Sequence, residues 1–472
     1  MDLQTPSSTA AFNKLPIELN KQIVHYLDTD RDICSFRLIC KNTNHAVDGD
    51  NLSFWRSRFR DAFAMKPGSS NNVLKKQYQR RKRYLRLGAG VDFYRGWTKQ
   101  EQKVLRVLRD LIVESFQGPY GLDEYGRPFC LNQQQLVKFV KNSKTFLDIK
   151  RLRKRKNAED DEKPYTSPAL AAIQLMCAHF LFGQEQTHNI YCFEVSQKAV
   201  YDTAADRPLY GGYNNLEVNM EWFLHCLNFF KYHMVSKSMQ SFHAIMDALD
   251  VTQKPSHWQA QLVDGCYPLS KHWKGTYAFL DAPELQELRN SSYDADEDDV
   301  FIDGNMEGDG KIQTLLLECV ESGKFNWPTI FEKHLQSKPR MKCRRTRAQQ
   351  RSMSPSDAEA VSIHFTGQGD DAEEHFFASG WLNPLPAQPR GIEIPGWQRI
   401  TFMKYFIDDD HQYAEDNLWA YEGVVLPGGR MILGRWWLVP EVADSAQSNY
   451  SGPFIFWAVG PEPDLDLDSS DE

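Results

Sequence analysis

The sequence lacks the segments that direct proteins into or across membranes. No apolar run reaches the roughly 18 residues that a transmembrane helix needs. The first residues, MDLQTPSSTAAFNK, contain no basic stretch followed by an apolar core, so they do not have the pattern of a secretory signal. We therefore expect a protein of the cytoplasm, the nucleus or both, without a membrane partner.

Paired cysteines are absent as well. The nine cysteines stand singly along the chain, and none forms a C-x-x-C pair. An odd number of scattered cysteines indicates free, mostly buried thiols rather than a disulfide framework. This usage is typical of a reducing compartment.

The familiar catalytic motifs are also missing. The sequence contains no G-x-S-x-G, no G-x-x-x-x-G-K-[ST] and no H-E-x-x-H. His225, His233 and His243 lie eight and ten residues apart, which places no pair at the i,i+4 spacing of helical metal ligands. We expect no enzyme activity, no cofactor and no metal, although a barrel can bring together catalytic residues that are distant in sequence.

The charge balance argues against nucleic acid as the main partner. The 472 residues carry a formal net charge of −8, with 41% apolar and 25% charged residues. A chain of this size and composition can form two or three domains with proper cores. Phosphate binding normally needs an excess of basic residues, although a local basic patch is compatible with this balance.

Short apolar stripes open the chain. Leu19, Ile23 and Leu27 follow at steps of four after Pro16, a residue tolerated in a first helical turn. Asp30 breaks the pattern and is expected to cap the next helix. Two further stripes consist of Ile33, Phe36 and Cys40, and of Leu52, Trp55, Phe59 and Phe63. Three such helices hold more apolar residues than one small core can hide, so we expect a partner surface.

The stretch LPIEL…IVHYLDTDRDICSFRLICK…FW within residues 12–63 resembles the F-box. This resemblance implies a three-helix domain that binds a Skp-type adaptor and, through it, a cullin scaffold. The adaptor-binding residues it implies are Leu15, Pro16, Ile17, Ile23, Leu27, Ile33, Leu38, Cys40 and Trp55. The alternative is a generic helical hairpin at the edge of a larger core.

Residues 64–265 have a mainly helical pattern. The segment NLEVNMEWFLHCLNFFKYHMVSKSMQSFHAIMDAL is apolar over much of its circumference and is expected to be buried. The basic segment LKKQYQRRKRYLRL at 74–87 fits a solvated helix face, which we prefer, or a phosphate-binding or nuclear-import patch. The charged segment at 150–164 is expected to be a mobile loop.

The pattern changes to a period of two in residues 266–460. VSIHFTG alternates apolar and polar residues. QRITFMKYF, LWAYEGVVL, MILGRWWLV and GPFIFWAVG have similar strand-like patterns. LPGGR at 426–430 is a strong hairpin turn. Glycines recur inside these strands at 275, 367, 423 and 434, which indicates a sheet that curls into a closed antiparallel barrel. The fold class we expect is α+β.

Several short motifs carry a second resemblance. They are W-x-G-T-Y at 273–277, F-x-G-x-G-x-D at 365–371, P-G-W-Q-R-I at 395–400, W-A-Y-E-G at 419–423 and G-R-W-W at 434–437. In this order, they resemble the C-terminal domain of a fungal type of F-box protein and, more loosely, lipocalin-like barrels on other F-box substrate receptors. The candidate target-binding aromatics are Trp381, Trp397, Trp419, Trp436 and Trp437, although core is the better default for any one of them.

Together the two resemblances imply a non-catalytic substrate-recognition subunit of an SCF-type ubiquitin ligase. The F-box would hold the adaptor and the barrel would hold an unidentified target protein. The alternative is a ligand-binding or enzymatic β-barrel protein whose N-terminal helices are only structural.

Polar insertions and tails complete the chain. The acidic segment at 290–311 lacks the bidentate carboxylate of a calcium loop in either register, so we expect a solvated, mobile loop. The segment at 337–359 is basic and then contains Ser-Pro, and either an import signal or a phosphorylation switch is as plausible as a plain loop. Residues 1–11 and the acidic tail 461–472 are expected to be disordered.

Overall fold

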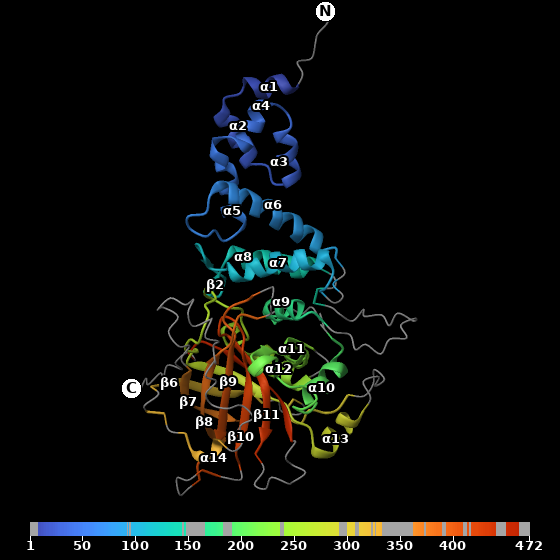
Figure 1. The fold of residues 1–472 in the computed structure, drawn as a ribbon, viewed down its shortest axis with the longest axis vertical. Coiled ribbons are helices and arrows are strands. Elements are labelled where there is room, and N and C mark those ends of the chain that lie inside the picture. The colour runs from blue at the N-terminus through green and yellow to red at the C-terminus, as the bar shows by residue number, and fades with distance from the viewer. Residues whose placement is uncertain are drawn as a thin grey trace, which may run out of the picture. The chain divides into compact units, whose positions relative to one another are not determined.

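A computed structural model shows the arrangement of helices and strands along the chain (Figure 1). It describes residues 8–91, 93, 96–143, 146–147, 166–182, 191–236, 240–291, 300–306, 311–321, 324–325, 327–332, 362–371, 374–388, 393–408, 413–414, 417–439 and 450–461. The expected loops at 150–164 and 337–359 lie outside the described residues, as do residues 1–7 and 462–472 of the expected disordered termini. None of the described helices is long and apolar enough to cross a membrane.

The chain forms two compact units. The N-terminal unit consists of residues 1–91 and 106–142, and the C-terminal unit consists of residues 92–105 and 143–472. The boundary falls inside helix α7 (Lys99–Val113). The segment expected as one helical middle region, 64–265, is therefore divided between the two units.

The N-terminal unit is helical. Its helices are α1 (Ser8–Lys14), α2 (Ile17–His25), α3 (Asp30–Arg37), α4 (Lys41–Asp48), the 3₁₀ turn η1 (Asp50–Leu52), α5 (Ser53–Ala62), α6 (Asn71–Gly88) and α8 (Leu131–Asn142). A short hairpin, β1 (Gly121–Leu122) and β2 (Pro128–Phe129), precedes α8. The apolar stripes did not predict α4, because its only buried aliphatic side chains are the adjacent Ala46 and Val47.

Capping at α3 differs by one residue from the expectation. Thr29, not Asp30, is the N-cap: its backbone is extended and its hydroxyl accepts a hydrogen bond of 3.1 Å from the backbone N–H of Asp32. Asp30 is the first residue of the helix, where a carboxylate still interacts favourably with the helix dipole. The prediction for Asp30 was therefore wrong, although the boundary between the helices was correct.

Aromatic residues of α5 and α6 form the core of this unit. Trp55 packs against Tyr78 with ring centroids 5.7 Å apart, and Phe59 packs against Phe63 at 5.4 Å. The buried Arg81 guanidinium lies over Phe59 and Phe63 and pairs with Glu114 at 2.6 Å. The third apolar stripe of the sequence is thus internal core rather than partner surface.

The C-terminal unit combines helices with a barrel. Its further helices are α9 (Pro168–Ala178), α10 (Phe193–Tyr201), α11 (Met220–Val235), α12 (Gln240–Ala248), α13 (Ala282–Asn290) and α14 (Thr329–Glu332). The 3₁₀ turns are η2 (His179–Leu181), η3 (Tyr213–Asn215) and η4 (Val251–Gln253), and β3 (Tyr210–Gly211) pairs with β4 (Glu217–Val218). As expected, α11 is buried along most of its length.

Eight antiparallel strands close the barrel. They are β5 (His272–Tyr277), β6 (Gln313–Val320), β7 (Ile363–Asp371), β8 (Glu374–Pro384), β9 (Gln398–Tyr405), β10 (Trp419–Val425), β11 (Met431–Leu438) and β12 (Ser451–Ala458). Neighbours pair in the order β10-β11-β12-β5-β6-β7-β8-β9, and β9 pairs back onto β10. The expected α+β fold with a C-terminal antiparallel barrel is confirmed.

Glycines give the barrel room for its large interior residues. Gly423 lies opposite Gly434 in the β10–β11 pair. A Cβ atom on Gly434 would lie 2.5 Å from the Phe454 ring and 2.3 Å from the Glu422 carbonyl oxygen. The predicted hairpin turn contains Gly428 and Gly429 at φ +94° and +66°, which side chains rarely adopt.

Helices of the same unit cover one outer side of the barrel, where α10 and α11 lie beside β11 and β12 (Figure 1). The Arg435 guanidinium of β11 lies 5.0 Å from the Trp222 ring of α11 and donates to the Asp202 carbonyl. Tyr210 donates its hydroxyl proton to the Gly423 carbonyl. Helices α10 and α11 and the segment that joins them therefore pack against the barrel.

Candidate functional site

The first helices of the N-terminal unit keep large apolar side chains in solvent. Leu19 on α2 is 44% exposed, while Tyr26 and Leu38, at the C-terminal ends of α2 and α3, are 85% and 81% exposed. Three large exposed apolar side chains thus stand on two consecutive short helices.

The structure separates the nine predicted adaptor-binding residues by exposure. Pro16 and Leu38 are exposed, and Ile33 and Trp55 are buried at 1% and 4% exposure. The half-buried residues are Leu15, Ile17, Ile23, Leu27 and Cys40. Seven of the nine are thus accessible, whereas Ile33 and Trp55 differ from the expectation that they face a partner.

The burial of Trp55 has a clear cause. Its ring packs against Phe54 and Tyr78, and its indole N–H donates to the Asp48 carboxylate at 2.8 Å. Asp48 also pairs with Lys75 and with Arg37, both at 2.7 Å. Trp55 therefore joins α4, α5 and α6 inside the unit instead of offering its face to another protein.

Asp48 is the electrostatic centre of this contact. Partial burial acts to raise the pKa of its carboxyl, but hydrogen bonds from Lys75 and Trp55 and the charges of Lys75 and Arg37 outweigh burial and lower the pKa. Asp48 is therefore ionised at neutral pH and fixes the helices that carry the exposed side chains.

Leu19 and Tyr26 were not among the predicted site residues. Leu19 belongs to the apolar stripe of α2, but the resemblance did not select it. Tyr26, the C-cap residue of α2, follows Leu19 by seven residues and Ile23 by three, so it continues the same face of the helix. The i, i+4, i+7 spacing of Leu19, Ile23 and Tyr26 was the signal that could have found it.

Most of the predicted target-binding aromatics are buried. Trp381 packs against Trp327 with centroids 4.6 Å apart, and Trp397 has no exposed surface. Trp436 lies in the barrel interior, whereas its neighbour Trp437 packs outside the barrel with Phe331 of α14. Only Trp419 of the five is half-buried, and it packs against Trp436. Four of these residues therefore have no free face for a target.

The barrel interior is a packed core. Phe402 and Tyr421 stack at 4.6 Å, and Phe454 packs against Tyr421 at 4.9 Å. Lys404 also points inward, where it pairs with Asp371 and lies 5.3 Å from the Tyr277 ring. Burial lowers the pKa of Lys404, and the Asp371 carboxylate partly opposes that shift.

The three singled-out histidines have separate partners. His225 stacks on Tyr191 at 3.9 Å, and burial lowers its pKa to about 3, so the ring is neutral. His233 contacts Asp303 at 3.2 Å, and His243 contacts the Met234 carbonyl at 3.1 Å. Across the described part of the chain, no group of three or more His, Cys, Asp or Glu side chains could hold a metal ion.

The acidic insertion differs in part from a solvated loop. Residues 292–299 and 307–310 lie outside the described residues, but Asp303 between them is buried. Gln197 donates to one Asp303 oxygen at 3.0 Å and the Tyr201 hydroxyl donates to the other. Asp303 therefore anchors the segment to α10 within the C-terminal unit.

Comparison with known families identifies one domain. The F-box domain model matches residues 12–55, which include the exposed side chains of α2 and α3. No curated protein and no solved structure matches the chain. The chain thus contains an F-box domain at residues 12–55 and, later in its sequence, a closed eight-stranded antiparallel β-barrel.

Proposed function

We propose that this protein is a substrate-recognition subunit of an SCF-type cullin-RING ubiquitin ligase. Its F-box binds a Skp-type adaptor, which links it to a cullin, and its C-terminal barrel region binds a target protein. The protein itself is not catalytic. It raises the effective concentration of the target near the conjugating enzyme, which partner subunits supply. It acts in the cytoplasm, the nucleus or both.

The main support is that the F-box match and the exposed apolar side chains fall on the same segment. The segment that matches the F-box domain also carries Leu19, Tyr26 and Leu38, which stay in solvent in the described structure. The accessible positions proposed to bind the adaptor are Leu15, Pro16, Ile17, Leu19, Ile23, Tyr26, Leu27, Leu38 and Cys40. Ile33 and Trp55 support this surface from inside the unit.

The barrel suits a binding role because it is rigid. Its interior is filled by aromatic and aliphatic side chains, so the outer faces of its strands keep fixed positions. Trp419 is the predicted aromatic that retains some exposed surface, and we propose it as part of the target-binding region. The likeness of the barrel to lipocalin-like or fungal F-box domains remains part of this proposal.

Adaptor binding tests the proposal. We expect the full chain to co-purify with a recombinant Skp-type adaptor, and the double variants L15A/P16A and Y26A/L38A to lose most of it. Each exposed side chain contributes up to about 1–2 kcal/mol at such an interface, so a double variant should lower affinity at least roughly tenfold. Leu122→Ala is the matched control, because Leu122 is 68% exposed in the same unit but lies outside the F-box segment.

Two other results would point elsewhere. If the wild-type chain binds no adaptor and retains a small molecule through purification, a ligand-binding or enzymatic barrel with purely structural N-terminal helices explains the protein better. If the adaptor binds but no cullin joins the complex, the protein is an F-box scaffold without a role in ubiquitin transfer.

A further inference from the structure

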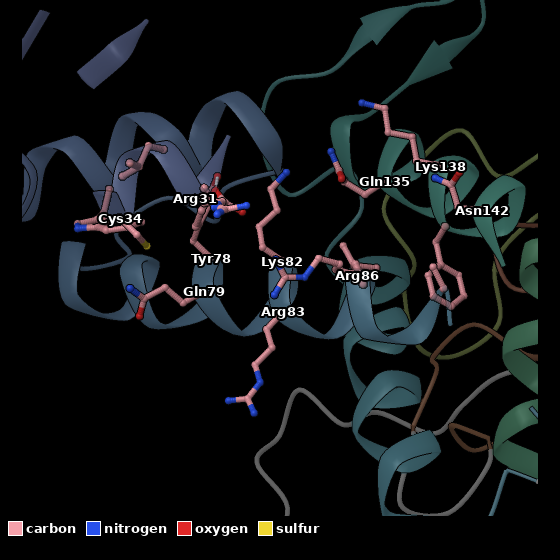
Figure 2. Close-up of a pocket in the computed structure, with 16 residues that line it drawn as sticks. Arg31, Cys34, Tyr78, Gln79, Lys82, Arg83, Arg86, Gln135, Lys138 and Asn142 are labelled. Carbon is pink, nitrogen blue, oxygen red and sulfur yellow. Dashed lines mark hydrogen bonds between the residues drawn. The ribbon is translucent and has the colours of Figure 1, made fainter. Parts of the chain in front are cut away.

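A basic groove lies within the N-terminal unit (Figure 2). It has a volume of about 750 Å³ and is formed mainly by α3, α6 and α8. Figure 2 shows Lys82 of α6 pointing into the space between Arg31 and Tyr78 on one side and Gln135 and Lys138 on the other. Segments that are about 100 residues apart in sequence therefore build one concave surface.

Nearly all the charged residues that line the groove are basic. Five basic residues line it, Arg31, Lys82, Arg83, Arg86 and Lys138, against the single acidic residue Asp30. Asp30 is already engaged, because the Tyr78 hydroxyl donates to its carboxylate at 2.9 Å. In the described structure none of the five basic side chains forms an ion pair within 4.0 Å. A chain with a net charge of −8 thus concentrates uncompensated positive charge in one place.

Lys82 lies among other positive charges and aromatic rings. It is half-buried, and its ammonium lies 5.9 Å from the Phe63 ring and 5.8 Å from the Tyr78 ring. Burial lowers its pKa, Asp30 opposes that shift, and the positive charges of Lys138 and Arg58 add to it. An anion in the groove would relieve this repulsion.

The rest of the lining suits a peptide better than a bare ion. Ile33, Trp55 and Phe139, which also line the groove, are apolar and buried. Gln79 and Asn142 contribute amides that both donate and accept hydrogen bonds, as an extended backbone requires, while the Gln135 amide already donates to the Ala62 carbonyl at 3.1 Å. Ligand sites commonly combine such an apolar lining with a few placed polar groups in a volume of this size.

We propose that this groove binds an acidic peptide segment of another protein. Aspartate or glutamate side chains of the peptide pair with Lys82, Arg86 and Lys138, and its backbone lies along the amides. Nucleic acid is a poorer match because the net charge of −8 repels a long polyanion. Under the function proposed above, the peptide belongs to a target or a regulator of the ligase.

The groove differs from the proposed adaptor surface. None of the accessible adaptor-binding positions proposed above lines it; of the nine residues predicted from sequence, only the buried Ile33 and Trp55 do. Charge reversal in the groove should therefore leave adaptor binding intact, so failure of this inference and failure of the proposed function can be told apart.

The test measures peptide binding to the full chain by fluorescence polarisation. The probe is a labelled 12-residue peptide of alternating glutamate and glycine, with a glutamine–glycine peptide and inorganic phosphate as comparison arms. We expect the glutamate peptide to bind, with affinity that falls as salt rises. R86E/K138E should lower that affinity roughly tenfold, and Lys82→Gln should lower it less.

The control matches the change in charge. R60E/K76E reverses two exposed cations of the same unit that do not line the groove, so it should change affinity less than about twofold. Unchanged circular dichroism verifies that each variant is folded, and adaptor binding is measured separately.

Four results would overturn the inference. The first is equal loss of affinity in the groove and control variants, which would mean a diffuse electrostatic effect. The second is equally tight binding of the glutamine peptide. The third is loss of adaptor binding in folded R86E/K138E, which would assign the groove to the adaptor. The fourth is peptide binding only after removal of residues 462–472, which would make the chain's own acidic tail the occupant.

Discussion

At the residue scale, the Asp48 carboxylate holds the helices of the F-box segment in place. Asp48 receives the Trp55 indole N–H and pairs with Lys75 and Arg37, so it connects α3, α4, α5 and α6. Charge-assisted contacts around a partly buried carboxylate are costly to lose, because the buried Trp55 N–H then loses its charged acceptor. The exposed Leu38 lies at the end of one of the helices that Asp48 fixes.

Asp48→Asn should therefore destabilise the N-terminal unit by about 1–3 kcal/mol. We expect faster amide hydrogen exchange in α3–α6 of the full chain, with little change in the barrel. Asp61→Asn, which changes an exposed carboxylate on α5, is the control and should leave exchange unaltered. Equal exchange rates in wild type and Asp48→Asn would show that this cluster does not hold the helices.

The same carboxylate makes the stability of the unit depend on pH. Because the pKa of Asp48 is lower in the folded state, its contribution is fully present above the unfolded pKa of about 3.9 and is lost as pH falls through the folded value. The difference in exchange between wild type and Asp48→Asn should thus be largest near neutral pH and shrink below about pH 4. A difference that persists unchanged at lower pH would assign the stabilisation to packing rather than to charge.

At the element scale, strands were easier to predict than helix faces. A period of two in VSIHFTG and the glycines of neighbouring segments were enough to predict a closed antiparallel barrel, because both follow from local geometry. An apolar stripe on a helix shows that one face is covered. It does not show whether this chain or another protein covers that face. Trp55 was expected to face an adaptor, whereas Tyr78 of a later helix and Asp48 bury it.

Gly434 tests the barrel geometry. Gly434→Ala adds a Cβ 2.3 Å from the Glu422 carbonyl oxygen and 2.5 Å from Phe454, so a strand must shift. We expect a loss of about 1–3 kcal/mol in urea unfolding followed by tryptophan fluorescence. Gly460→Ala is the control, since nothing lies within 4 Å of a Cβ there. A Gly434→Ala variant as stable as the control would mean that these strands do not pack as described.

At the scale of the whole molecule, function follows from which surfaces each unit leaves open. The barrel buries Trp381, Trp397, Trp436 and Trp437, while the F-box helices leave Leu19, Tyr26 and Leu38 in solvent. Sequence reasoning located the F-box and the barrel, and seven of the nine positions that it selected for adaptor binding are accessible. It did not find the basic groove, because Arg31, Lys82 and Lys138 come from three separate helices and their proximity depends on tertiary packing.

Hydrogen exchange of the full chain with and without a purified Skp-type adaptor tests the central claim most directly. The account predicts that the adaptor slows exchange in residues 12–40, where the exposed apolar side chains lie, and leaves the eight barrel strands unchanged. Absence of a complex, or protection confined to the barrel, would contradict it.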